Sequence, residues 1–215
     1  MATFATNARE KLFSMAIQFG FIDPISRRNP TLESELSNIL VLRHQHNPPL
    51  IDWSKVPLLT FKPEDAPNEN GNASAGEEVE SADFFRTALY VTAEYPLFAH
   101  LTRNGQTWAS KKGDVILCKP GKFVVMIENK LDAKYTGDGN HLENGQLALQ
   151  AHYLDSLEGF PDRYLILLSG YEFFSNYWNS SDLYRLSLHR EKSEKRGVKL
   201  LLLAWEDIFA ANKQL

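Results

Sequence analysis

The sequence predicts an α/β fold in which helices flank a mixed central sheet. Two observations lead to this class. The apolar segments 114–118 and 123–130 are separated only by the turn-forming residues KPGK, so we expect them to pair as an antiparallel hairpin. A helix is expected from Gln146, between the strand at 123–130 and the apolar strand at 163–169. Because a helical crossover normally joins parallel strands, the same sheet should contain both kinds of pairing.

The other predicted elements come from periodicity and capping signals. Apolar residues at helical spacing predict an amphipathic helix near the N-terminus, and short β-rich runs bounded by turn formers predict further strands. These elements are a helix at 9–20, a second helix capped by Asn29 or Thr31, a strand within 88–102, a strand at 197–205 and a closing helix at 206–215.

Composition limits the class of protein. A chain of 215 residues that is 43% hydrophobic can bury a full core, so we expect one domain over residues 1–215. The longest apolar run, 200–205, is far shorter than the ~18 residues that indicate a membrane span, so no membrane partner is expected. The single cysteine, Cys118, excludes an internal disulfide and a multi-cysteine zinc site. With an N-terminal helix that does not look like an export signal, these features predict a cytoplasmic protein.

Charge is unevenly distributed along the chain. The formal net charge is −4, but residues 64–83 hold seven acids and no base, which leaves +3 for the rest. This segment is rich in Gly, Asn, Ala and Ser and lacks hydrophobic periodicity, so it predicts an acidic, mobile insertion. The remaining body is slightly basic.

Charged residues at the end of a core strand give the candidate site. Side chains alternate along a strand, so Glu128 and Lys130 share one face of the strand at 123–130. Asp114 begins the preceding strand, and the hairpin should bring it beside Glu128. Two carboxylates beside a lysine are typical of a Mg²⁺ site, in which Mn²⁺ can substitute, and the lysine can orient an attacking water. This chemistry suits phosphodiester hydrolysis.

The same residues resemble a known signature. Asp114, thirteen intervening residues and then Glu128-Asn129-Lys130 are similar to the motif of the PD-(D/E)XK nuclease superfamily, especially branches whose strand reads I-E-N-K. The segment from Glu33 resembles the first helix of that branch, and the segment from Gln146 resembles its Q-L helix. Gly113 stands where the family name has proline. Gln150 stands where the Q-L-x-x-Y pattern has tyrosine, with Tyr153 one turn later. Gln146, Gln150 and Tyr153 share one helical face, which suits either a polar wall over an active site or a polar stripe that faces solvent.

The resemblance implies a restriction-endonuclease-like core and a Mg²⁺-dependent nuclease of the restriction, defence or repair type, with DNA as the expected substrate and RNA as the alternative. It implies that Asp114, Glu128 and the backbone carbonyl of Asn129 bind the metal, that Lys130 positions water, and that Glu33 and Gln146 assist. A catalytically silent module with the same fold, for nucleic-acid binding or complex assembly, stays open. A homodimer and a subunit of a larger system also stay open.

Weaker signals have alternatives of their own. A second D-x-K spacing, Asp132 to Lys134, lies beyond the strand. His44 and His46 suit either a metal site or an ordinary surface loop. The basic segment 184–199 suits either a patch for the DNA backbone or a solvated hairpin.

Overall fold

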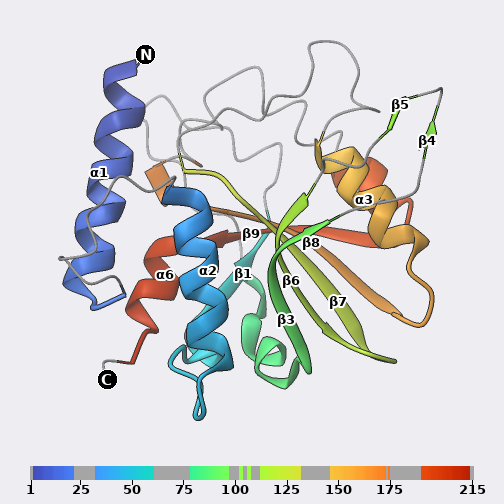
Figure 1. Ribbon diagram of the computed structural model, residues 1–215, viewed down its shortest axis with the longest axis horizontal. Coiled ribbons are helices and arrows are strands. Elements are labelled where there is room, and N and C mark those ends of the chain that lie inside the picture. The colour runs from blue at the N-terminus through green and yellow to red at the C-terminus, as the bar shows by residue number, and fades with distance from the viewer. Residues whose placement is uncertain are drawn as a thin grey trace.

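A seven-stranded mixed sheet forms the centre of the protein, in a computed structural model that describes residues 2–21, 32–60, 78–96, 102–103, 106–107, 112–131, 146–172, 174 and 190–213. The strand order is β2-β1-β9-β8-β7-β6-β3 (Figure 1). The strands are β1 (Pro57–Leu59), β2 (Glu78–Ser81), β3 (Tyr90–Pro96), β6 (Lys112–Lys119), β7 (Phe123–Asn129), β8 (Asp162–Ser169) and β9 (Val198–Ala204). A separate two-stranded sheet pairs β4 (Thr102–Arg103) with β5 (Gln106–Thr107).

The pairing confirms the predicted α/β class with a mixed sheet flanked by helices. β6 and β7 are antiparallel, with Val115 opposite Ile127. β7 and β8 are parallel, with Ile127 opposite Ile166, and α3 (Gln146–Ser156) lies between them in the chain. β9 continues the parallel arrangement beside β8. The hairpin and the helical crossover are therefore both present.

Helices cover both faces of the sheet. Figure 1 shows α1 (Ala2–Gln18), α2 (Leu32–Gln45) and α6 (Trp205–Ala210) on one side, and α3 on the other. Two short 3₁₀ helices, η2 (Trp53–Lys55) and η4 (Ala82–Thr87), contact each other, and their Trp53 and Phe85 rings pack together in the core of the α2 side. Among the described residues, no helix combines the length and the apolar character needed to cross a membrane.

β7 lies between two cores, and all seven of its residues are buried. Val125 and Ile127 belong to the core under α2, whereas Val124 and Met126 belong to the core under α3. A strand covered on both faces is expected to be continuously apolar. By the same alternation, Glu128 faces the α3 side and Asn129 faces the α2 side.

Three boundaries differ from the predictions. Of the acidic insertion expected over 64–83, residues 78–83 instead form β2 and the start of η4. Residues 64–77 lie outside the described residues, so for them the insertion stays a prediction. The sequence did not predict β1 and β2, which have three and four residues and little apolar alternation. Helix α1 begins at Ala2, well before residue 9, and α6 ends at Ala210.

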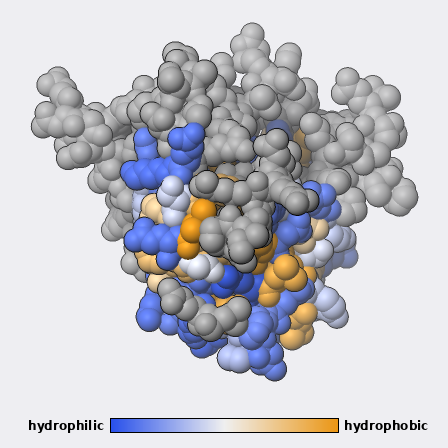
Figure 2. Space-filling model, turned by 60° about the vertical axis from the view of Figure 1, so that its left-hand side comes forward, coloured by the Kyte–Doolittle hydropathy of each residue, from blue (hydrophilic) through white to orange (hydrophobic). Residues whose placement is uncertain are grey.

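The described surface is of mixed character. On the face seen in Figure 2, hydrophilic side chains surround small hydrophobic patches. The large apolar side chains that are exposed are Leu42, Leu89, Tyr90 and Tyr95. Scattered apolar residues are ordinary on protein surfaces, so they do not by themselves indicate a docking site.

Candidate active site

The neighbouring ends of β6 and β7 bring the predicted carboxylates together. The last ladder pair is Val115 with Ile127, and the same register extended by one residue sets Asp114 opposite Glu128. The regular ladder stops here: the backbone N–H of Asn129 donates to Asp114 Oδ2 at 2.7 Å. The Asp114 carboxylate therefore replaces a backbone carbonyl as the acceptor for this part of β7.

The backbone beside Asp114 is also unusual. In the β3–β6 ladder, Ala93 pairs with Val115 and Tyr95 pairs with Gly113, so Glu94 stands across from Asp114. Glu94 has a φ of 51°, a left-handed conformation that a non-glycine residue rarely adopts. Residues held in such conformations concentrate at functional sites, where the surrounding structure stabilises them.

Glu128 is a fully buried carboxylate with one partner on each oxygen. Lys130 Nζ lies 2.7 Å from Oε1, and Gln150 Nε2 donates to Oε2 at 2.5 Å. Burial, and then the charge of Asp114, raise the pKa of Glu128 to about 7, against the opposing effects of Lys130 and Gln150. Close to neutral pH, this carboxyl therefore changes its protonation state easily.

The pKa values of Asp114 and Lys130 reflect the same crowding of charge. Burial raises the pKa of Asp114, and the charges of Glu33 and Glu94 add to the effect. For Lys130, burial alone would lower the pKa, but the charges of Glu128, Glu33 and Asp114 outweigh it and raise the pKa. Lys130 is consequently a stable ammonium that can orient or stabilise negative groups, and it is not suited to accept a proton.

Glu33, in the first turn of α2, joins these residues from the helix side. Its Oε1 accepts a hydrogen bond from the backbone N–H of Leu131 at 2.9 Å, just beyond the end of β7. Its charge acts on both Asp114 and Lys130. The structure thus brings Glu33, Asp114, Glu128 and Lys130 to one edge of the sheet.

The side chain of Asn129 forms hydrogen bonds that link the end of β7 to two helices. Its Nδ2 donates to the backbone carbonyl of Glu33 at 2.9 Å and to Ser37 Oγ at 3.2 Å, both in α2. Its Oδ1 accepts from Trp205 Nε1 at 2.9 Å, at the start of α6. This role was not predicted from the sequence, although an asparagine at the end of an apolar strand is a signal for one, because buried polar groups need hydrogen-bond partners.

The backbone carbonyl of Asn129 is the group that we expect to bind a metal. In a strand, the N–H and C=O of one residue point to the same side, and the N–H of Asn129 points to Asp114. The carbonyl therefore faces the β6 side as well.

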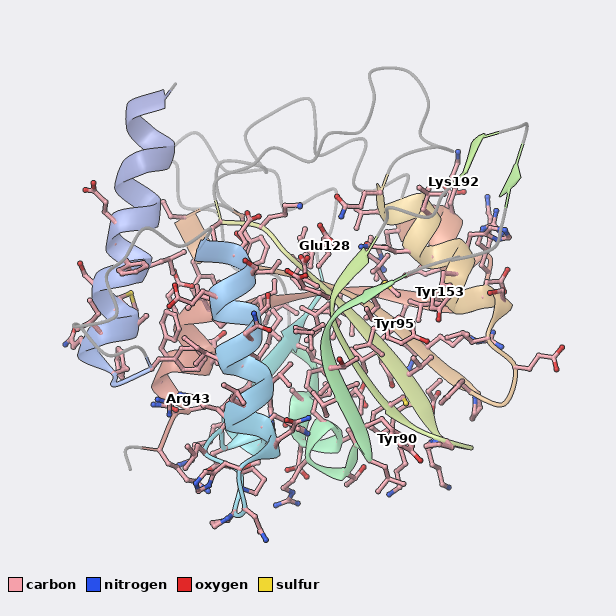
Figure 3. The ribbon with its side chains drawn as sticks, in the orientation of Figure 1. Arg43, Tyr90, Tyr95, Glu128, Tyr153 and Lys192 are labelled. Carbon is pink, nitrogen blue, oxygen red and sulfur yellow. The ribbon has the colours of Figure 1, made fainter. Side chains whose placement is uncertain are left out.

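The helix that follows β7 meets the site through Gln150. Gln146 is the half-buried first residue of α3, and it is Gln150, one turn later, that bonds Glu128. Beyond it, the ring of Tyr153 lies 6.3 Å from the ring of Tyr95 at the end of β3 (Figure 3). The sequence placed Gln150 on one helical face with Gln146 and Tyr153, and in the structure Gln150 is fully buried and contacts Glu128.

The two histidine candidates have different environments. His44 is buried, and Trp53 Nε1 donates to its Nδ1 at 3.0 Å. Burial lowers the pKa of His44 to about 4, so the ring is neutral. His46 is exposed, and its Nδ1 lies 2.9 Å from the backbone oxygen of Pro48. Across the part of the chain that the structure describes, no three His, Cys, Asp or Glu side chains are grouped to hold a metal ion.

The basic segment carries paired charges in its described part, residues 190–199. Arg190 bonds Glu194 at 2.8 Å, and Lys195 bonds Glu191 at 2.6 Å. Lys192 is exposed on the same short helical stretch, 190–194 (Figure 3). A DNA-binding role for this segment stays a prediction. Residues 184–189, and the second D-x-K spacing at Asp132 to Lys134, lie outside the described residues.

Comparisons of this chain with protein-family models, with curated proteins and with solved structures found no match.

Proposed function

We propose that this protein is a Mg²⁺-dependent nuclease of the PD-(D/E)XK type that hydrolyses phosphodiester bonds in DNA. The observation that carries the proposal is the register of β6 and β7, which sets Asp114 opposite Glu128 while Lys130 lies 2.7 Å from Glu128. The mixed sheet between helices is compatible with a restriction-endonuclease-like core. The match of Asp114 and Glu128-Asn129-Lys130 to the family signature adds support.

The residues present fit a divalent cation. Burial, and then the charge of Asp114, raise the pKa of Glu128, and a cation between the two carboxylates would relieve their repulsion. Two carboxylates are enough for Mg²⁺, which keeps several of its waters and needs few protein ligands. Asp114 and Glu128 would hold the ion, with the carbonyl of Asn129 as a further oxygen ligand. Bound there, Mg²⁺ or Mn²⁺ would act as a Lewis acid that stabilises charge on the phosphoryl group.

The chain itself supplies orientation and charge. The water oxygen forms a bond to phosphorus and releases a proton to solvent, the ester P–O bond breaks, and the departing oxygen keeps the electron pair and takes a proton from solvent. Lys130 stays protonated, so its ammonium can orient the attacking water and offset the charge that develops on the phosphate. Glu33 holds the end of β7 in place by accepting a hydrogen bond from the N–H of Leu131. Gln150 holds Glu128 in place by donating a hydrogen bond to its carboxylate.

The competing function is a nuclease-fold module without catalysis. One observation favours it: the two Glu128 oxygens already have partners, a lysine ammonium and an amide. In that case the Glu128–Lys130 pair would be a buried structural ion pair. Metal binding separates the two functions.

The test is cleavage of labelled duplex DNA, single-stranded DNA and RNA in Mg²⁺, in Mn²⁺ and in EDTA. Metal-dependent cleavage of DNA that is lost in both Asp114→Asn and Glu128→Gln would support the proposal. Mn²⁺ binding, followed by electron paramagnetic resonance, gives a second readout. A folded wild-type protein that neither binds Mn²⁺ nor cleaves any of these substrates would be a silent module.

A further inference from the structure

Gln150 stands out because it is a polar residue in an apolar layer. It is fully buried on the sheet-facing side of α3. Its helix neighbours Leu147, Ala151 and Leu154 pack against the sheet in the same core as Met126. Burying an amide among apolar groups is costly unless the amide forms hydrogen bonds. Packing alone would be served better by leucine, so Gln150 needs another explanation.

Its hydrogen bonding points to Glu128. The amide Nε2 donates to Glu128 Oε2 at 2.5 Å, whereas among the described residues no donor bonds the buried amide oxygen Oε1. A buried amide with an unsatisfied oxygen contributes little to stability for its own sake. The side chain of Gln150 is therefore placed so that its Nε2 bonds Glu128, at the expense of a hydrogen bond to its Oε1.

The two partners of Glu128 differ in a way that matters for a cation. Lys130 holds Oε1 with a positive charge that would repel an approaching metal ion, whereas the amide of Gln150 is neutral. A neutral donor fixes the plane of the carboxylate without cancelling its charge. Of the two contacts, only the hydrogen bond from Gln150 can therefore stay as it is when a cation binds Glu128.

We propose that Gln150 is a positioning residue that holds the Glu128 carboxylate from α3 in the orientation needed to bind a divalent cation. This inference rests on the proposed function of the site. It assigns to Gln150 the supporting role that the sequence suggested for Gln146. Hydrogen-bonding partners of metal-binding side chains typically change metal affinity or activity by about 10–100-fold when they are removed.

The experiment compares Gln150→Met with Gln45→Met. Gln150→Met keeps the side-chain length and removes the donor. Gln45→Met also removes an amide donor, whose exposed bond runs from Gln45 Nε2 to the backbone oxygen of Val91 at 2.9 Å. Gln45 is the last residue of α2, twelve residues after Glu33, which is about 18 Å along a helix at ~1.5 Å per residue. Mn²⁺ affinity is measured by electron paramagnetic resonance, and Mg²⁺-dependent cleavage is measured over a range of metal concentrations.

Gln150→Met should weaken Mn²⁺ binding about 10-fold or more, and Gln45→Met should leave it within about twofold. In cleavage, the loss should appear mainly as a higher Mg²⁺ concentration for half-maximal rate and should shrink at saturating Mg²⁺. Gln150→His carries a ring N–H donor at a similar reach and should recover part of the affinity. A purely structural role would give neither the metal-specific loss nor the recovery.

Thermal melting shows whether each variant folds. If Gln150→Met does not fold, Gln150→Leu takes its place, because leucine suits the apolar layer. A folded Gln150→Met or Gln150→Leu protein with wild-type Mn²⁺ affinity would overturn the inference and leave the proposed nuclease standing. Wild-type protein that binds no Mn²⁺ and does not cleave would instead remove the proposed function, and this inference with it.

Discussion

The indole N–H of Trp205 donates to Asn129 Oδ1 at 2.9 Å, which joins the start of α6 to the end of β7. The Asn129 amide also reaches Glu33 and Ser37 in α2. One side chain therefore connects three elements behind the candidate site. The backbone N–H of Asn129 donates a hydrogen bond to the Asp114 carboxylate.

Asn129→Ala should destabilise the fold, because it leaves the buried Trp205 N–H and the Ser37 hydroxyl without this partner. Leaving a buried polar group unsatisfied costs about 1–3 kcal/mol, so we expect the free energy of unfolding to fall by about 2 kcal/mol. Urea unfolding followed by circular dichroism measures it. Asn38→Ala, the same change on the exposed face of α2, should alter stability by less than about 0.5 kcal/mol. Equal effects of the two substitutions would show that the Asn129 network does not stabilise the junction.

The sequence could predict this site where its geometry depends on alternation within one hairpin. Glu128 lies on β7 and Lys130 directly follows the strand, two residues later, so their side chains meet independently of how the helices pack. Asp114 follows from the length of the hairpin turn, which sets the β6–β7 register. Local rules were sufficient for these three residues because the spacing along one strand and the short turn of the hairpin set their relative positions without any contact from the helices.

The contacts made by helices could not be predicted in the same way. Whether Gln146 or Gln150 reaches Glu128 depends on how α3 rotates against β7 and β8, and that rotation is set by many apolar contacts. Strand β2 could not be predicted for a similar reason. Its backbone pairs with β1, and its sequence, EVES, has too little apolar character to reveal this. The left-handed φ of Glu94 is also a consequence of tertiary packing.

Glu128 should make stability depend on pH. Its pKa is raised from 4.5 to about 7 in the folded protein, so the folded state holds this proton more tightly than the unfolded state. The resulting stabilisation is fully present below pH 4.5 and is lost as the pH rises through 7. Glu128→Gln lacks this dependence. In EDTA, the stability of the variant relative to wild type should therefore increase by about 1–3 kcal/mol between pH 4.5 and pH 8.

Urea titrations of both proteins at several pH values measure this difference, which removes the contributions of other titrating groups. A stability difference that stays constant from pH 4.5 to pH 8 would mean that Glu128 titrates in the folded protein as it does in the unfolded chain.

His44 should also make stability depend on pH, with the opposite sign to Glu128. Its pKa is lowered from 6.5 to about 4 by burial, so protonation favours the unfolded state. Its contribution is present above pH 6.5 and is lost as the pH falls toward 4. Relative to His44→Gln, the wild type should therefore lose about 2–3 kcal/mol of stability between pH 7 and pH 4. The matched control is His46→Gln, which replaces an exposed histidine two residues away. Parallel pH profiles for wild type and His44→Gln would contradict a neutral, buried His44.

Lys130 offers the sharpest test of the chemistry. Lys130→Ala removes the ammonium next to Glu128, and loss of one electrostatic stabiliser typically lowers kcat by about 10²–10³-fold. Lys130→Arg keeps the charge but should rescue little, because a planar guanidinium cannot occupy the position of a compact ammonium whose side chain is only 14% exposed. Single-turnover cleavage at saturating Mg²⁺ measures the chemical step apart from binding. Lys195→Ala, which breaks an exposed pair with Glu191, controls for the loss of a surface charge and should leave the rate nearly unchanged.

Because Lys130 is not expected to bind the metal, Mn²⁺ affinity should stay the same or rise in Lys130→Ala while cleavage falls. Cleavage that survives in Lys130→Ala at the wild-type rate would assign the Lys130–Glu128 pair a structural role and leave the chemistry to other residues.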